Sequence, residues 1–203
     1  MLRLATTAFG LLFLVSGVAG AQNKDARVLA EQGQGLLDQG NVVAACAKLA
    51  ESARIERKLA TELLLASCYE RAGRTASAWS QYQVVAKLAS EAGDKEWQRE
   101  MMAIERSRAL EKKLVRLTIT APAATAGLAI RRGGELLPSG QLGVAVPVDP
   151  GEITITATAP GFEPFSTTVR IAKQKLTTVE VPALRKGEPP ATPPAAETPP
   201  PQT

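Results

Sequence analysis

Histidine is absent from the 203 residues of this chain, and aromatic residues make up only 4% of it. Without histidine there is no Ser-His or Cys-His pair, no histidine metal site and no proton shuttle of the usual kind at neutral pH. A search for paired carboxylates, nucleophile settings and phosphate-binding loops finds no constellation above background. The sequence therefore predicts a protein that is not an enzyme and that carries no cofactor and no metal.

Proline is absent before Pro122, and all 14 prolines lie there or later, so the chain changes character near residue 120. The chain also lacks a large excess of charge of one sign. The 24 Lys and Arg residues exceed the 20 Asp and Glu residues by a net charge of only +4. Nucleic-acid binding needs basic side chains clustered on one face, and here both signs are interspersed. We therefore expect no nucleic-acid partner.

The longest apolar run, residues 9–18, is too short to cross a bilayer. It follows Arg3 and precedes the small-x-small triplet at residues 19–21, which is typical of a secretory signal peptide over residues 1–21. The alternative is a retained membrane anchor. No cysteine lies near the predicted cleavage site, so lipid anchoring is not expected. The sequence predicts an exported protein, most simply periplasmic and not membrane-spanning after cleavage, with secretion as the alternative.

Residues 22–116 are predicted to be helical, because the segment lacks proline and is rich in good helix formers. Apolar and small residues recur there at helical spacing, and glycines at positions 40, 73 and 93 interrupt the pattern. The same spacing favours a core position over a ligand platform for the aromatic residues, which are Tyr69, Trp79, Tyr82 and Trp97. The predicted helices cover residues 24–39, 42–56, 60–72, 75–92 and 95–116.

The helical segment repeats itself with an offset of 33 residues. Residues 40–45 align with residues 73–78. The further aligned pairs are Gly33 with Ala66, Leu36 with Tyr69, and Leu49 with Tyr82. This period resembles that of the tetratricopeptide repeat, and small residues at the aligned positions would let paired helices cross closely. The alternative is an unrelated array of helical hairpins.

Cys46 and Cys68 are separated by 22 residues and form no CxxC motif. An exported chain with an even number of cysteines favours a disulfide, and the two residues fall on neighbouring predicted helices. The alternative is two buried free thiols.

From residue 117 to residue 185 the hydrophobic period changes to two, most clearly where Ile153 and Ile155 alternate with threonines. Turn residues separate six or seven short strands, which predicts a small β-sandwich. Residues 117–119, 148–155 and 159–162 resemble the PEGA domain family, although residues 121–124 read Ala-Pro-Ala-Ala where that family has Pro-Glu-Gly-Ala.

The predicted fold class is thus all-α plus all-β: a TPR-like antiparallel array of about five helices, a PEGA-like β-sandwich and a Pro-rich tail. Over residues 25–182 this arrangement is similar to a group of exported bacterial repeat proteins of uncharacterised function. Residues 186–203 contain seven prolines in 18 positions, so a packed core is not expected there. A solvated tail and a ligand for a Pro-recognising partner remain as two interpretations of it.

We expect function to lie in protein–protein interaction or scaffolding in the cell envelope, with a protein or peptide partner held in the groove that a TPR-like array presents. In that hypothesis Arg27 and Arg71 hold a carboxylate, and Leu37 and Leu63 hold an apolar side chain. The groove positions implied by the repeat are Arg27, Gln34, Leu37, Leu63, Ser67, Glu70 and Arg71. The alternatives are that these are merely solvated helix positions, that the sandwich binds peptidoglycan, or that the chain has a purely structural role in a larger assembly.

Overall fold

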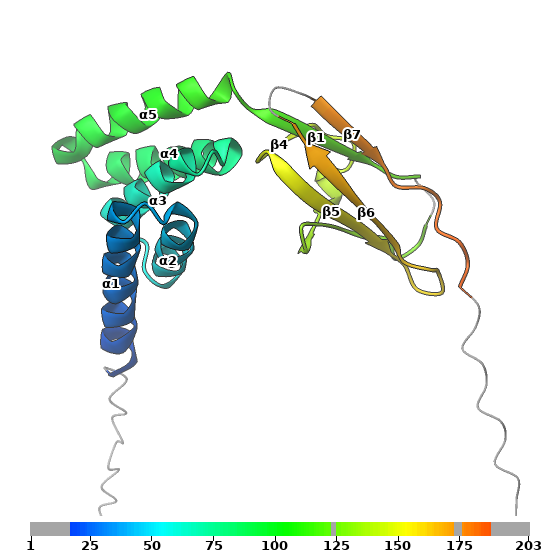
Figure 1. Ribbon diagram of the computed structural model, residues 1–203, viewed down its shortest axis with the longest axis horizontal. Helices are drawn as coiled ribbons and strands as arrows, with labels where there is room; N and C mark the ends of the chain where they lie inside the picture. Colours follow the sequence, from blue (N-terminus) through cyan, green and yellow to red (C-terminus); the bar gives the residue numbers. More distant parts are fainter. Residues whose placement is uncertain (1–16, 123–124, 173–175, 188–203) are drawn as a thin grey trace, which may run out of the picture. The chain divides into compact units, whose positions relative to one another are not determined.

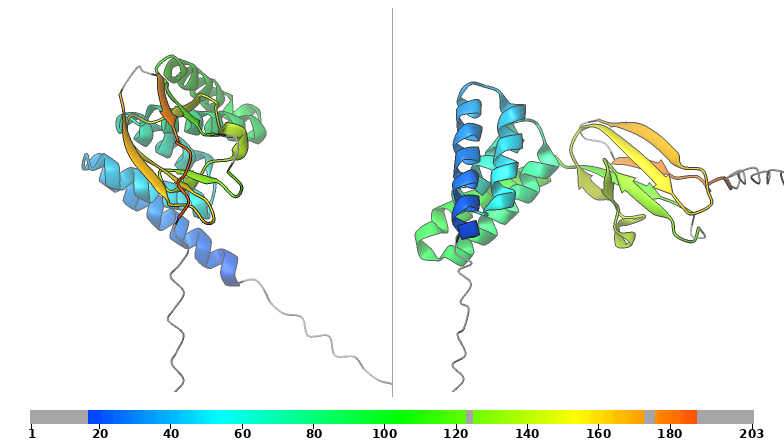
Figure 2. Two further views of the ribbon diagram at one scale, coloured as in Figure 1. Left: turned by 90° about the vertical axis from the view of Figure 1, so that its right-hand side faces the viewer. Right: turned by 90° about the horizontal axis from the view of Figure 1, so that it is seen from below.

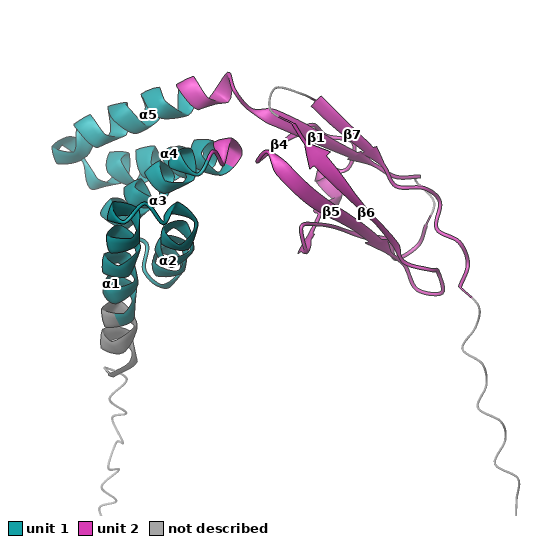
Figure 3. Ribbon diagram, viewed as in Figure 1, with its two compact units in different colours: residues 1–72, 77–108 teal, residues 73–76, 109–203 magenta. Residues whose placement is uncertain are grey.

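The computed structural model describes residues 17–122, 125–172 and 176–187. Most of the predicted signal peptide and most of the Pro-rich tail lie outside these residues. The described chain consists of helices followed by strands, as predicted (Figure 1). Its elements group into two compact units, one covering Met1–Ala72 and Ser77–Arg108, the other Gly73–Ala76 and Ala109–Thr203 (Figure 3).

Five α-helices occupy the predicted helical ranges, but the first begins at Gly17 and not at residue 24, so it also covers residues 17–21 of the predicted signal peptide. They are α1 (Gly17–Asp38), α2 (Val42–Ile55), α3 (Leu59–Arg71), α4 (Thr75–Ala92) and α5 (Trp97–Glu111), with a short 3₁₀ helix, η1 (Asp94–Glu96), before α5. The predicted last helix continued to residue 116 and is too long. The chain is already extended at Val115, where the first strand begins.

The turn between α1 and α2 shows why the chain reverses at this point. Gly40 has φ +78°, a conformation that glycine adopts without steric cost. The Asn41 amide donates to the Leu36 carbonyl at 2.9 Å and the Gly40 amide to the Leu37 carbonyl at 3.1 Å, which is the hydrogen-bond pattern of a Schellman motif. The Asn41 side chain then accepts from the Ala44 amide at the start of α2. Gly73, at the aligned position of the second repeat, has φ +71°.

Helices α1 and α2 cross closely because Gly33 has no side chain. A Cβ added to Gly33 would lie 2.7 Å from Cγ of Leu49. The Ser52 hydroxyl also donates to the Ala26 carbonyl at 2.7 Å across the same pair of helices. Ala66, aligned with Gly33, is fully buried, so the aligned positions match in burial as well as in sequence.

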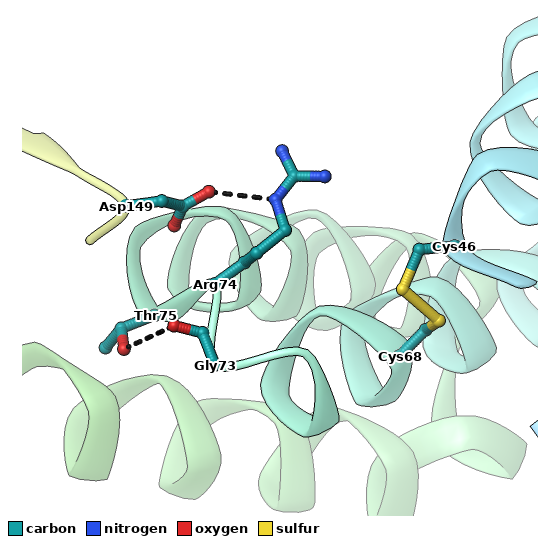
Figure 4. Close-up of polar contacts among 6 residues, drawn as sticks. All are labelled: Cys46, Cys68, Gly73, Arg74, Thr75 and Asp149. Atoms are coloured by element: carbon teal, nitrogen blue, oxygen red, sulfur yellow. Dashed lines mark hydrogen bonds and ion pairs between the residues drawn. A yellow bond between two sulfur atoms is a disulfide. The ribbon is translucent and has the colours of Figure 1, made fainter. Parts of the chain in front are cut away.

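Cys46 of α2 and Cys68 of α3 form a disulfide, with their Cα atoms 5.5 Å apart (Figure 4). This confirms the predicted disulfide and excludes the alternative of two free thiols. The bond lies in a core shared by α1, α2 and α3, in which Leu37, Leu49 and Leu65 are also buried.

Seven strands follow the helices. They are β1 (Val115–Thr120), β2 (Ala129–Arg132), β3 (Glu135–Leu136), β4 (Val146–Val148), β5 (Gly151–Thr158), β6 (Phe165–Ile171) and β7 (Leu176–Glu180). A 3₁₀ helix, η2 (Ser139–Gln141), lies between β3 and β4.

The strands form two sheets that face each other (Figure 2). One sheet has the order β4-β1-β7, with β1 antiparallel to β4 and parallel to β7; the other has the order β3-β2-β5-β6 and is antiparallel throughout. Inward residues of both sheets share one core, in which Leu117 and Ile155 are completely buried. The alternation seen in the sequence thus separates this core from an outer threonine face.

Candidate functional site

Three residues of the predicted groove lie together on one face of α3. They are Leu63, Ser67 and Glu70. These residues are spaced four and three positions apart, so they lie on one side of the helix. All three are half-buried. We call these three residues the α3 face.

Two neighbouring helices hold the Glu70 carboxylate at the end of this face. The Tyr82 hydroxyl of α4 donates to Glu70 Oε2 at 3.0 Å, and Arg106 Nη1 of α5 lies 3.6 Å from Glu70 Oε1. Burial of the Tyr82 ring and the hydrogen bond to the Glu70 carboxylate raise the pKa of Tyr82 to about 12. Tyr82 therefore stays a neutral donor at physiological pH, and α3, α4 and α5 converge on one carboxylate.

A second carboxylate, Glu62, lies on the inner side of α3 and is only 3% exposed. Burial raises its pKa, against the opposing effects of the Arg57 guanidinium and a hydrogen bond from Gln81. Arg57 Nε lies 3.3 Å from Glu62 Oε1, and the Gln81 amide of α4 donates to Glu62 Oε2. Since Glu62 is enclosed and both of its oxygens have partners, we interpret it as a contact between α3 and α4 and not as a ligand site.

The remaining predicted groove residues make local contacts. Arg27 pairs with Glu31 at 3.4 Å, one turn along α1, and both side chains are well exposed. The Gln34 amide donates to Asp38 Oδ1 at 2.9 Å. Leu37 is 4% exposed and belongs to the core.

The structure does not bring Arg27 and Arg71 together. The Arg71 guanidinium donates to the Leu37 carbonyl at 3.4 Å, near the C-terminal end of α1. Arg27 lies ten residues earlier on the same helix, which corresponds to about 15 Å along its axis. A carboxylate held by Arg71 in this position is therefore out of reach of Arg27, so the candidate site centres on α3.

Trp97 of α5 was expected in the core but is 57% exposed, and Met101, four residues later on the same helix, is 53% exposed. The helical spacing correctly indicated an apolar stripe. It could not show that part of this stripe faces away from the array, because the period of a helix does not reveal what covers each side. These residues are the clearest functional candidates that the sequence alone did not single out.

The outer face of the β3-β2-β5-β6 sheet is the second polar surface of interest. Thr154 pairs with Thr168 across β5 and β6, and their hydroxyl oxygens are 3.1 Å apart. Thr156 pairs with Ser166 in the same ladder. The result is a row of hydroxyl groups, which fits the alternative hypothesis of glycan binding.

An apolar cavity of about 330 Å³ also lies in the second unit. Ser139 supplies its only side-chain hydroxyl, and no charged residue lines it. Its lining residues are Leu128, Ala129, Ile130, Leu136, Leu137, Pro138, Ser139 and Leu142. With so few polar groups, the cavity has no means of orienting a polar substrate.

The turn at Gly73–Ala76, which groups with the second unit, carries an ion pair. Arg74 Nε lies 3.0 Å from Asp149 Oδ2 (Figure 4). Half of the Arg74 side chain is exposed. Such partly exposed ion pairs contribute little to stability.

Over the ranges that the structure describes, no group of three or more Asp, Glu or Cys side chains is placed to hold a metal ion. No helix in this part of the chain has the length and apolar character needed to span a membrane. No protein-family model matches the sequence, and no curated protein matches it significantly.

Proposed function

We propose that this chain is a non-enzymatic interaction or scaffold protein of the cell envelope, and that its partner is a protein or peptide bound across the α3 face. In this proposal the helices form a TPR-like array, the strands form a PEGA-like sandwich, and residues 1–21 direct export to the periplasm. The aligned glycines and the matching burial of Gly33 and Ala66 support the assignment of the helices, and the two facing sheets support that of the strands.

The observation that carries the proposal is the convergence of three helices on Glu70. Contacts from α4 and α5 fix this carboxylate, so the α3 face is held before any partner arrives. A surface that is ordered in advance loses less conformational entropy on binding. Leu63 offers an apolar contact and Ser67 a hydroxyl one turn away, a combination suited to a peptide side chain beside its backbone.

The test is a pull-down from envelope extract with the wild type and three single variants. Leu63→Arg and Ser67→Arg place a long charged side chain on the α3 face, whereas Ser80→Arg makes the same change at an exposed serine of α4. We expect the first two variants to recover at least tenfold less of the wild-type partner, and Ser80→Arg to recover the wild-type amount. Equal recovery by all four proteins, with unchanged circular dichroism spectra, would refute the assignment of the α3 face.

The hydroxyl row on β5 and β6 favours a second candidate function, peptidoglycan binding through the sandwich. This alternative predicts that the double variant Thr154→Ala/Thr168→Ala loses sedimentation with purified peptidoglycan, while Leu63→Arg sediments as the wild type does. Leu63→Arg is common to both tests: it should lose the protein partner if the α3 face is the binding site, and it should keep sedimentation with peptidoglycan if the sandwich is.

A further inference from the structure

The outward side of α5, at the end of the helical array, carries a strip of three apolar residues followed by an arginine. Its members are Trp97, Met101, Ile104 and Arg108, spaced four, three and four residues apart. We call these four residues the α5 strip. Trp97 and Met101 are more than half exposed, and Ile104 is half-buried.

The α5 strip lies on the side of the helix that turns away from the array. Ala103 and Leu110, on the opposite side, are almost completely buried, and Arg106 reaches toward Glu70 of α3. A shallow groove of about 460 Å³ runs along the strip. Stacked helical arrays normally end in a polar outer face, so an apolar final face indicates that another helix packs there.

We propose that the α5 strip binds the α5 strip of a second copy of this chain, with the two helices antiparallel. The four-three-four spacing is that of a coiled-coil seam. In the symmetric register Met101 of each copy faces Ile104 of the other, and Trp97 of each copy faces Arg108 of the other. A guanidinium over an indole ring is a favourable cation–π pair, so both ends of the seam are closed by attractive contacts.

A polar contact and the avoidance of like charges favour this orientation. At the edge of the antiparallel seam, Gln98 of one copy comes beside Glu105 of the other, and the amide can donate to the carboxylate. A parallel pair would place Arg108 opposite Arg108, with two like charges in direct opposition. The strip is therefore complementary to itself when antiparallel and repulsive when parallel.

The size of the seam sets the expected affinity. One helix pair with four contacting side chains per copy lies below the area of a standard stable interface. We expect a reversible dimer with a dissociation constant on the order of 10–100 µM. The α5 strip and the α3 face lie on different helices, so the inference holds whether or not the proposed partner site is correct.

Sedimentation velocity of the chain lacking its predicted signal peptide tests the proposal, over protein concentrations up to about 500 µM. We expect the sedimentation coefficient to rise with concentration for the wild type. Met101→Lys should weaken association at least tenfold, because it places a cation in the apolar centre of the seam. Val43→Lys, at an exposed valine of α2, should associate as the wild type does. A wild type that stays monomeric, or a Met101→Lys variant that associates equally well, would overturn the proposal.

Cysteine pairing tests the register. Met101→Cys and Ile104→Cys variants, distinguished by a mass tag, are mixed and oxidised with the native Cys46–Cys68 bond intact. We expect the mixed disulfide to exceed the sum of the two symmetric disulfides, the amount that unselective pairing of an equimolar mixture gives, because position 101 faces position 104 in the antiparallel seam. An excess of the symmetric products, which a parallel pair would give, would overturn the antiparallel arrangement.

Discussion

The helices and the strands of this chain fill their cores with different side chains. Among the described residues of α1 to α5, seven of the fifteen buried hydrophobic residues are alanines. From Val115 onward only one of eleven is an alanine, and the others are valine, leucine or isoleucine. Small side chains let helix axes approach to about 8–10 Å, whereas facing sheets about 10 Å apart need large side chains to fill the space between them.

Because their cores differ in this way, the helices and the sheets should respond in opposite ways to a change in side-chain size. Helices packed through glycine and alanine have no room for larger side chains, so enlargement should be their characteristic weakness. Sheets packed through leucine and isoleucine are left with cavities when these side chains are truncated. Truncation should therefore destabilise the sheets more than enlargement does. We predict four effects in decreasing order, of which those of Leu117→Ala and Gly33→Ala test the comparison directly.

Leu117→Ala should have the largest effect, a loss of about 2–5 kcal/mol from the free energy of unfolding. Leu117 is fully buried between the sheets, and removing its side chain leaves a cavity. Chemical denaturation followed by circular dichroism measures the loss, and hydrogen exchange locates it in the strand peptides. Leu176→Ala, at a position 66% exposed, is the control and should cost much less. Equal costs at the two positions would contradict the assignment of the sandwich core.

Loss of the disulfide should destabilise the helices by about 3 kcal/mol, the chain-entropy value for a loop of this length. Cys46→Ala/Cys68→Ala removes the bond without burying a new polar group. Both tryptophans, Trp79 and Trp97, lie in the helices, so their fluorescence reports unfolding there. The wild-type midpoint in denaturant should fall when reductant is added, and that of the double variant should not move. If reductant leaves the wild-type midpoint unchanged, the disulfide contributes nothing to the stability of the helices.

Gly33→Ala and Gly35→Ala form a matched pair with opposite expected signs. The new Cβ at position 33 would lie 2.7 Å from Cγ of Leu49, so we expect a loss of about 1–3 kcal/mol. No atom lies within 4 Å of a Cβ at position 35, so alanine there should stabilise α1 by about 0.5–1 kcal/mol. Thermal melts of the two variants compare them directly. Stabilisation by both would mean that α1 and α2 do not cross closely at Gly33.

The smallest effect concerns the pH dependence of stability through Glu62. Its pKa is raised in the folded state, so the folded chain retains this proton to a higher pH than the unfolded chain does. Stability should therefore fall as the pH rises from the ordinary glutamate pKa of 4.5 through the raised folded-state pKa of Glu62. Glu62→Gln keeps an acceptor for Gln81 and removes the charge, so its stability should change less over this range. If the two proteins show the same slope of stability against pH, the folded-state pKa of Glu62 is not raised.

The sequence was sufficient for the features that depend on local spacing. Glycines 33 residues apart correctly marked the helix ends, since positive φ at Gly40 and Gly73 is a local requirement. The two cysteines were correctly paired because their helices are neighbours in the array. The alternation around Ile155 likewise separated the inner and outer faces of β5.

Features that depend on what covers a residue could not be predicted. Trp97 continues the apolar period of the array, yet no α-helix follows α5 in the described chain. Arg71 belongs to the predicted groove by its position, but its long side chain bends back to the Leu37 carbonyl. Glu62 was not singled out, because a buried carboxylate on α3 has the same sequence pattern as a solvated one.

The most direct test of the central claim, that a protein partner binds across the α3 face, is photo-crosslinking in intact cells. The photoreactive residue benzoylphenylalanine is placed in turn at Ser67 on α3, at Ser80 on α4 and at Thr154 on the outer sheet, and the products are read by mass spectrometry. We predict a discrete protein adduct from position 67 that is absent from positions 80 and 154. A discrete adduct from position 154 together with none from position 67 would contradict the account and move the function to the sandwich.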